Sequence, residues 1–473
     1  MAEFHIENFG CRAARADGEA VAAQLRAAGH CLQQAAEADV VVVNTCSVTA
    51  EADRAARAFI RRTHRRNPQA RIVVTGCYAQ RAPQELAEMA GVAAVVGNSH
   101  KALAPQLVHG LLNPVEPQTA PELVHIALAE KVTFQQKPWS ASAQLAPPQV
   151  VVVLADDRFA HSFLEDEQVV AGAQTRPNLK IQEGCGNRCT FCVIPSTRGP
   201  SKSLPHAVVL RQVEGFAAAG GNELVLSGIN LGRWGRDLAA PSTLARLVRQ
   251  LLTATALPRL RLSSIEPMDW DAELIALLAE FGGTRLARHA HLPLQSGSDA
   301  VLRRMHRRYR PWHYAAKVEA LLKAAGPALT LGADVMVGFP GETEAEFEQT
   351  CALVRELPFG YLHLFPFSAR PGTPGEALHA AAPVAATVVE ERMAVLRALA
   401  EEKSQTHRRQ FVGHLLPALS LHTPPELAAR GRSTALTDNF LAVELVGAHP
   451  ANQVVSVRVT GLSSSGELEA QAV

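Results

Sequence analysis

The chain has 473 residues, of which 47% are hydrophobic and 19% charged, and its formal net charge is +1. A chain of this length exceeds what one hydrophobic core normally organises, so we expect two to four domains. The near-zero charge excludes nucleic-acid binding through overall charge alone, and no apolar run reaches the roughly 18 residues of a membrane span. The amino terminus has no signal-peptide pattern, so we expect a cytoplasmic protein with no membrane partner and with reduced cysteines.

Residues 1–112 are expected to form an amino-terminal domain. Apolar runs typical of strands alternate here with alanine-rich stretches of helical spacing. The expected strands are residues 4–9, 40–43 and 72–74, and the expected helices are residues 17–28 and 50–64. This order of elements predicts a parallel α/β sheet with helices on its faces.

Three cysteines in this domain, Cys11, Cys46 and Cys77, directly follow the carboxyl ends of expected strands. The carboxyl ends of parallel strands share one edge of a sheet, where ligands bind, so the three thiols should meet there. The pattern predicts a cluster held by three thiolates. The alternative is three unrelated cysteines in strand-to-helix turns. After this domain, residues 113–177 contain scattered prolines and one apolar run at 149–154, and we interpret them as a linker that contains a little β-structure.

A second group of three cysteines, Cys185, Cys189 and Cys192, has the spacing C-x3-C-x2-C. A [4Fe–4S] cluster usually takes four thiolates, so three would leave one iron open to a substrate. A closed zinc site would need a fourth ligand, and the nearest histidine in the chain, His206, lies outside the loop. Three inert buried cysteines fit poorly with a loop that glycine and asparagine interrupt.

Residues 178–382 contain six expected strands separated by helical patterns. The strands are residues 179–182, 223–227, 260–265, 289–294, 331–337 and 361–365. Six β-α units predict a partial (β/α)6 barrel with its reactive groups on the loops after the strands. Residues 383–410 fit a long amphipathic connecting helix, and residues 411–473 have short strands typical of a small antiparallel β-barrel. Such barrels commonly bind RNA, although a packing role fits the sequence equally well.

Two runs of basic residues, within 54–66 and 303–310, contrast with the even charge of the whole chain. Each run follows a candidate site segment, so we expect contacts with phosphate groups. Solvated helix faces are the alternative.

The motif that begins at Cys185, with Phe191 before its last cysteine, resembles the signature of the radical S-adenosylmethionine (SAM) enzymes. In that family the open iron chelates SAM, and reductive cleavage of SAM gives a 5′-deoxyadenosyl radical. The segments at residues 8–11, 43–49 and 74–80 resemble the amino-terminal blocks of the methylthiotransferase branch. One departure is the run 12–15, where members of the branch usually carry an asparagine.

The resemblance implies a radical SAM barrel, a TRAM-like carboxyl-terminal domain and two [4Fe–4S] clusters. Cys11, Cys46 and Cys77 would hold one cluster, and the catalytic Cys185, Cys189 and Cys192 would hold the other. It also implies contacts to SAM at the ends of barrel strands. The residues in question are Gly220, Gly221, Ser264, Glu266, Gln295 and Gly338. A plain turn at the two glycines and ordinary loop capping by the polar residues are the alternatives.

Three further segments, at residues 181–185, 262–267 and 361–368, look most like the enzymes that act on N6-threonylcarbamoyladenosine in tRNA. The resemblance then implies a transferase that adds a methylthio group at C2 of the adenosine at position 37. One SAM would methylate a sulfur at the first cluster and a second SAM would supply the radical. The implied partners are the tRNA anticodon loop and an electron donor such as flavodoxin or ferredoxin. The alternatives are a methylthiotransferase of isopentenyladenosine or of a ribosomal-protein aspartate, and a non-enzymatic metal-containing RNA-binding protein.

Overall fold

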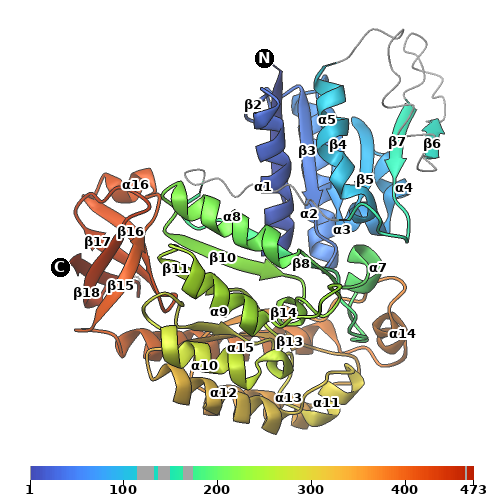
Figure 1. Ribbon diagram of the computed structural model, residues 1–473. Helices are drawn as coiled ribbons and strands as arrows, with labels where there is room; N and C mark the ends of the chain where they lie inside the picture. The colour runs from blue at the N-terminus through green and yellow to red at the C-terminus, as the bar shows by residue number, and fades with distance from the viewer. Residues whose placement is uncertain (1, 114–132, 137–149, 163–173, 464–465) are drawn as a thin grey trace.

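A computed structural model describes residues 2–113, 133–136, 150–162, 174–463 and 466–473. The chain forms an amino-terminal α/β domain, a central open barrel and a small carboxyl-terminal barrel (Figure 1). The α/β architecture expected from the sequence is therefore confirmed. In the described part of the chain, no helix combines the length and the apolar character that crossing a bilayer requires.

The amino-terminal domain is built on a sheet of seven strands in the order β2-β1-β3-β4-β5-β7-β6. The strands are β1 (Glu3–Asn8), β2 (Cys31–Leu32), β3 (Val40–Thr45), β4 (Arg71–Gly76), β5 (Val92–Gly97), β6 (Thr133–Gln136) and β7 (Val150–Leu154). The helices are α1 (Arg12–Ala27), α2 (Ala50–Arg66), α3 (Cys77–Arg81), α4 (Pro83–Ala87), the 3-10 helix η1 (Asn98–Leu103) and α5 (Ala104–Leu112).

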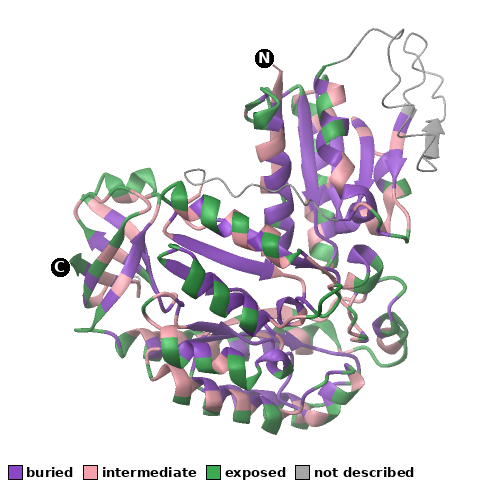
Figure 2. Cartoon of the chain, viewed as in Figure 1, coloured by how far each residue is buried: buried purple, intermediate pink, exposed green. Residues whose placement is uncertain are grey.

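The four consecutive valines of β3 show why this sheet is covered on both faces. Val40 and Val42 pack in one hydrophobic cluster with residues of α1 and α5, whereas Val41 and Val43 pack in another with residues of α2 and α3. Side chains alternate between the two faces of a strand, and a strand buried on both faces therefore needs an unbroken apolar run. The burial colouring of Figure 2 shows these strands buried between helices whose outer surfaces are exposed.

The sheet extends beyond the boundary that we expected at residue 112. Strand β7 pairs in parallel with β5, Ala94 facing Val152, and β6 pairs antiparallel with β7. Residues 150–154 of the apolar run within the expected linker therefore belong to the amino-terminal sheet. Its pairing partner lies more than 50 residues earlier in the chain, so the local pattern could not reveal it. Residues 114–132, 137–149 and 163–173 of the expected linker lie outside the described part.

The central domain has six parallel strands, which confirms the expected partial (β/α)6 barrel. They are β8 (Asn178–Glu183), β10 (Glu223–Gly228), β11 (Arg259–Leu262), β12 (His289–His291), β13 (Thr330–Val337) and β14 (Phe359–Pro366), with the short antiparallel β9 (Lys202–Ser203) beside β8. Their helices are α7 (Ile194–Arg198), α8 (His206–Ala218), η3 (Leu231–Arg233), α9 (Leu244–Ala254), η4 (Pro267–Asp269), α10 (Ala272–Phe281), α11 (Asp299–Arg304), α12 (Pro311–Ala325), α13 (Glu344–Glu356) and α14 (Pro374–Ala381). Ile265 N donates to His291 O at 3.0 Å and so joins the two halves of the curved sheet.

The last part of the chain closes the central domain and adds the third one. Helix α15 (Ala386–Arg409) packs on β14. Its bounds are close to those of the expected connecting helix, 383–410. Beyond it lie α16 (Pro425–Ala428) and a closed barrel, β15 (Leu415–Ser420), β16 (Arg432–Thr437), β17 (Ala442–Val446), β19 (Leu468–Ala472) and β18 (Val454–Leu462). This barrel contacts the central domain at the amino-terminal ends of the central strands. Arg288 pairs with Asp438 at 2.6 Å, and Asn222 Nδ2 donates to Asn452 O at 2.7 Å.

Candidate active site

The first cysteine triad lies at the carboxyl edge of the amino-terminal sheet, as the strand order predicts. The register pairs Asn8 with Asn44 and Thr45 with Gly76, so β1, β3 and β4 end side by side. Gly10 has φ +107°, and a β-carbon at this position would lie 2.6 Å from Cys46 Cβ. Only glycine therefore lets the loop that carries Cys11 approach Cys46 this closely. Burial, together with the neighbouring Cys77 and Cys11, raises the pKa of Cys46 to about 12.

The second triad is carried by one loop directly after β8. Cys192 N donates to Cys189 O at 3.2 Å, and Asn187 N donates to Cys185 Sγ at 3.4 Å. Burial and the charges of Cys189 and Cys185 raise the pKa of Cys192 to about 12. Three thiolates on one partly buried loop repel one another, and a bound cation stabilises such a set.

Two donors from other barrel strands reach the sulfurs of the second triad. Asn230, after β10, donates from Nδ2 to Cys185 Sγ at 3.5 Å, and Arg307 donates from Nη1 to Cys189 Sγ at 3.3 Å. Arg307 also forms an ion pair with Glu266, which follows β11. Such donors favour the thiolate form of cysteine, the form that binds metal.

The two triads are connected by α7, which begins two residues after Cys192. At its end, Arg198 Nε donates to Cys77 Sγ of the first triad at 3.2 Å. Asn98, from the amino-terminal domain, donates both to Cys77 Sγ at 3.4 Å and to Thr197 O at 2.8 Å. A single turn of helix in the barrel domain therefore contacts the first triad and follows the second, so both triads lie at one domain boundary.

Arg198 belongs to a buried network of three cations and two carboxylates. Its Nη1 lies 3.1 Å from Asp17 Oδ2 and 2.6 Å from Glu183 Oε1, and Lys101 and Lys180 pair with the same two carboxylates. Burial alone would raise the pKa of Glu183, but Arg198, Lys101 and Lys180 hold it well below its usual value. The network has one more positive charge than negative charges. Because this excess lies beside Cys77, it stabilises negative charge at the sulfur site.

The number of thiols in each triad distinguishes a structural zinc ion from an iron–sulfur cluster. A closed zinc site takes four protein ligands, whereas three thiolates on a [4Fe–4S] cluster leave one iron open to a substrate. Each triad supplies three thiols and therefore suits a cluster.

Four of the residues expected to contact SAM lie at the same edge as the second triad. Ser264 and Glu266 follow β11, Gln295 follows β12 and Gly338 follows β13. Gln295 has φ +63°, and its buried Oε1 has no hydrogen-bond partner in the described part of the chain. Gly338 packs closely against α15, since a β-carbon there would lie 2.5 Å from Val389 Cγ2.

The expectation for Gly220 and Gly221 is corrected. These glycines precede β10 and therefore lie at the amino-terminal edge of the barrel, opposite the cysteine loop. Gly220 O accepts a hydrogen bond from Asn452 of the carboxyl-terminal barrel at 2.9 Å, and a β-carbon on Gly221 would lie 2.2 Å from Phe216. They shape a turn and a domain contact, and the polar residue that β10 does bring to the cysteines, Asn230, was missed.

The basic run at 303–310 is mostly paired within the chain. Arg307 is buried against Cys189 and Glu266, Arg304 pairs with Glu346 at 2.8 Å, and Arg303 pairs with Asp299. The expectation of phosphate contacts is thus not supported for this run. In the run at 54–66, Arg61, Arg65 and Arg66 are exposed on α2.

The lumen of the barrel carries a polar cluster that the sequence did not single out. His291 Nε2 and His363 Nδ1 lie 3.1 and 3.2 Å from the two oxygens of Asp334, and Tyr361 OH lies 3.0 Å from His291 Nδ1. Burial would raise the pKa of Asp334, but hydrogen bonds from His291 and His363 hold it well below its usual value. All four side chains point inward from β12, β13 and β14, and they give the lumen a hydrogen-bonding surface.

The fold and the two triads define a radical SAM protein with a second thiol site, and comparisons with known proteins agree. Residues 179–354 match the radical SAM superfamily, and residues 3–97 match a family described as the uncharacterized protein family UPF0004. A radical SAM methyltransferase from Kitasatospora setae, TsrM, has a similar fold (TM-score 0.54, 15% identity, 79% of this chain and 77% of that chain).

Curated relatives are similar over nearly the whole length. The threonylcarbamoyladenosine tRNA methylthiotransferase MtaB of Bacillus subtilis (strain 168) is 32% identical over 97% of this chain and 94% of its own. The tRNA-2-methylthio-N(6)-dimethylallyladenosine synthase of Parafrankia sp. (strain EAN1pec) is 33% identical over 87% of this chain and 76% of its own. The chain belongs to the radical SAM methylthiotransferase family of tRNA-modifying enzymes. Membership implies SAM and [4Fe–4S] clusters as cofactors.

Proposed function

We propose that this protein adds a methylthio group to C2 of N6-threonylcarbamoyladenosine at position 37 of tRNA. The observation that carries the proposal is that the two cysteine triads lie at one domain boundary. There, Arg198 of the barrel donates a hydrogen bond to Cys77 of the amino-terminal domain. This chemistry needs a radical centre and a sulfur donor close to each other. The choice of substrate is supported by the B. subtilis relative, which spans nearly all of the chain.

The residues of each triad have separate roles in this proposal. Cys185, Cys189 and Cys192 would hold the cluster that binds SAM, and Cys11, Cys46 and Cys77 would hold the cluster that carries the sulfur. With SAM, the cluster held by Cys185, Cys189 and Cys192 would supply a carbon radical that can take hydrogen from an unactivated C–H bond. The C2–H of adenine has no acidic character, so no side chain is needed there as a general base.

The protein side chains would position the reactants and exclude water. Ser264, Glu266, Gln295 and Gly338 lie around the carboxyl edge of the barrel and would hold SAM. Arg307 would keep Glu266 in place through its ion pair. The polar cluster of His291, Asp334, His363 and Tyr361 would hydrogen-bond the base that enters the lumen.

The RNA substrate must deliver its base into the barrel. An adenosine in the anticodon loop would have to leave its stack, at a cost of a few kcal/mol. The carboxyl-terminal barrel and the exposed arginines of α2 are surfaces that could hold the rest of the loop. The reaction also needs an electron donor such as flavodoxin or ferredoxin, and the cytoplasm supplies both tRNA and donor.

Mass spectrometry of tRNA nucleosides, with and without the gene, tests this proposal. Loss of the 2-methylthio form of threonylcarbamoyladenosine in the deletion strain, restored by the wild-type gene but not by a Cys46→Ala gene, is the expected result. Loss of the 2-methylthio isopentenyl nucleoside instead would assign the chain to the dimethylallyl relatives. An unchanged nucleoside pool would contradict a tRNA substrate.

A further inference from the structure

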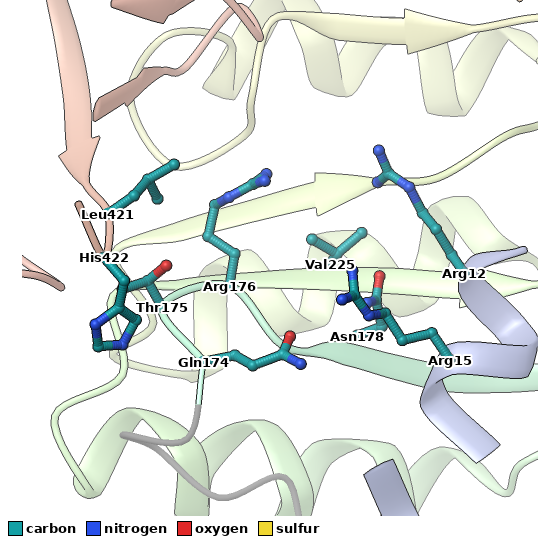
Figure 3. A pocket seen from close by; sticks show the side chains of 9 residues that line it. All are labelled: Arg12, Arg15, Gln174, Thr175, Arg176, Asn178, Val225, Leu421 and His422. Atoms are coloured by element: carbon teal, nitrogen blue, oxygen red, sulfur yellow. The ribbon is translucent and has the colours of Figure 1, made fainter. Parts of the chain in front are cut away.

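A basic cavity of about 330 Å³ lies where the three domains meet. Figure 3 shows Arg12 and Arg15 reaching into it from α1, and Arg176 reaching into it from the segment before β8. Asn178 and Val225 form its wall, and Leu421 and His422 of the carboxyl-terminal barrel close one side. We call this cavity the arginine pocket.

The arginine pocket opens on the lumen side of the barrel. Leu179 and Leu224 point into the helix-covered core, so their strand neighbours Asn178 and Val225 face the lumen. The cysteine loop leaves the opposite end of the same strand, β8. A ligand that extends along the lumen from the cysteine site would therefore approach this pocket.

Among the described residues, positive charges around the pocket outnumber negative ones. A single buried carboxylate, Glu223, serves three arginines, at 3.5 Å from Arg176, 3.3 Å from Arg259 and 2.7 Å from Arg261. The guanidinium of Arg12 has no hydrogen bond or ion pair among the described residues and rests on the ring of Phe440 at 5.6 Å. Among the described residues, three arginines thus share Glu223 and Arg12 is unpaired, whereas Arg15 pairs with Glu19 at 3.6 Å.

Two donor atoms in this group, Arg259 Nε and Arg261 Nη1, are buried without a hydrogen-bond acceptor among the described residues. Arg176 Nη1 lies 3.5 Å from its ion-pair partner, Glu223 Oε1. Burial brings the pKa of Arg176 down to about 10, because the charge of Glu223 compensates for burial only in part. Buried unpaired charge is costly, and a protein retains it where a ligand of opposite charge completes the site.

We propose that the arginine pocket binds an oxyanion of the tRNA substrate, namely the carboxylate of the threonylcarbamoyl group on the modified adenosine. This inference rests on the proposed function. A threonine attached through its amino group keeps a free α-carboxylate, and planar guanidinium groups match a carboxylate with paired hydrogen bonds. A dimethylallyl group has neither charge nor acceptor, and it would leave these arginines unpaired.

A backbone phosphate of the same tRNA presents similar chemistry, and the pocket distinguishes the two by its position. A phosphate stays on the outside of the RNA, whereas the substituent of a flipped base is carried into the lumen. The arginine pocket thereby selects for the modified nucleoside: it recognises the charge that the threonylcarbamoyl group adds.

Binding measurements on the full-length protein test this. The probes are anticodon stem–loop RNAs with threonylcarbamoyladenosine, its neutral methyl ester, or plain adenosine at position 37. The variants are Arg176→Gln, Arg12→Gln and the charge-preserving Arg176→Lys, with Arg211→Gln on the exposed face of α8 as the control. Circular dichroism and iron content show that each variant is folded and loaded.

We expect wild-type protein to prefer the threonylcarbamoyl RNA, and each glutamine variant to lose about tenfold or more of that affinity with little change for the ester or plain RNA. Arg176→Lys should retain part of the preference and Arg211→Gln all of it. An equal loss for all three RNAs, with a weaker salt dependence, would overturn the carboxylate assignment in favour of a phosphate. If both glutamine variants still preferred the threonylcarbamoyl RNA, the arginine pocket would not be the site that recognises its carboxylate. Absence of any preference in the wild type would instead contradict the proposed function.

Discussion

Arg198 is the residue on which the contact between the two halves of the site depends. It is fully buried, and it donates to Cys77 while pairing with Asp17 and Glu183. Removing one member of a buried ion network leaves the charges of its partners uncompensated. The resulting loss in the free energy of unfolding exceeds the net contribution of the ion pairs themselves.

Arg198→Ala should therefore lower the free energy of unfolding by about 3–5 kcal/mol. The matched control is Arg303→Ala, which removes an exposed pair with Asp299 and should cost less than about 1 kcal/mol. Urea unfolding of both variants by circular dichroism measures the difference. Equal costs for the two substitutions would mean that the network adds nothing to the domain contact.

Gly10 provides a test of the first triad at a single position. Gly10→Ala would place a β-carbon 2.6 Å from Cys46 Cβ, so we expect the loop with Cys11 to move away and roughly half of the iron to be lost. Gly29→Ala is the matched control, because Gly29 also has a positive φ, +88°, but has open space around it. Each substitution costs about 1 kcal/mol in backbone strain. Only Gly10→Ala should also lose iron on anaerobic reconstitution. Full iron in Gly10→Ala would show that the close approach is not required.

At the scale of elements, the strands and their ends were predictable, and contacts between domains were not. The convergence of Cys11, Cys46 and Cys77 follows from parallel pairing alone, since residues after parallel strands share an edge. Gly220 and Gly221 have the glycine pattern of a ligand-binding turn, but they precede β10 and so lie at the opposite edge of the barrel from the cysteine loop. The contact of Arg198 with Cys77 depends on how two domains dock, and no local pattern in the sequence encodes that.

The packing of α15 on β14 predicts a pH dependence of stability. His407 of α15 is buried, with Nε2 2.8 Å from Thr330 Oγ1, and burial together with Arg408 lowers its pKa to about 4. In the unfolded chain histidine titrates near 6.5, so between pH 6.5 and 4 the unfolded state binds the extra proton. Stability should fall as the pH falls through this window, by up to about 3 kcal/mol.

His407→Gln keeps a hydrogen-bonding side chain but removes the titration. The difference in the free energy of unfolding between wild type and His407→Gln should narrow as the pH is lowered from 7 to 4.5, in urea titrations at matched ionic strength. A difference that stays constant across this range would show that His407 does not titrate abnormally.

At the scale of the whole molecule, three domains meet around one lumen. The amino-terminal domain brings a thiol triad to the carboxyl edge of the barrel, and its helix α1 also contributes Arg12 and Arg15 near the other end. The carboxyl-terminal barrel closes that end through Arg288–Asp438 and Arg261–Thr437 contacts. The loop with Cys185, Cys189 and Cys192 and the arginine pocket thereby lie at opposite ends of β8, and Arg12 connects the pocket to the first triad because it directly follows Cys11.

The central claim is that each triad holds a cluster of its own, and iron analysis tests it most directly. Anaerobically reconstituted wild-type protein is compared with two triple alanine variants, one of Cys11, Cys46 and Cys77 and one of Cys185, Cys189 and Cys192. We predict that each variant keeps roughly half of the wild-type iron with a [4Fe–4S] spectrum, and that only the first still cleaves SAM. A variant that keeps all of the iron, or loses all of it while remaining folded, would contradict two independent clusters.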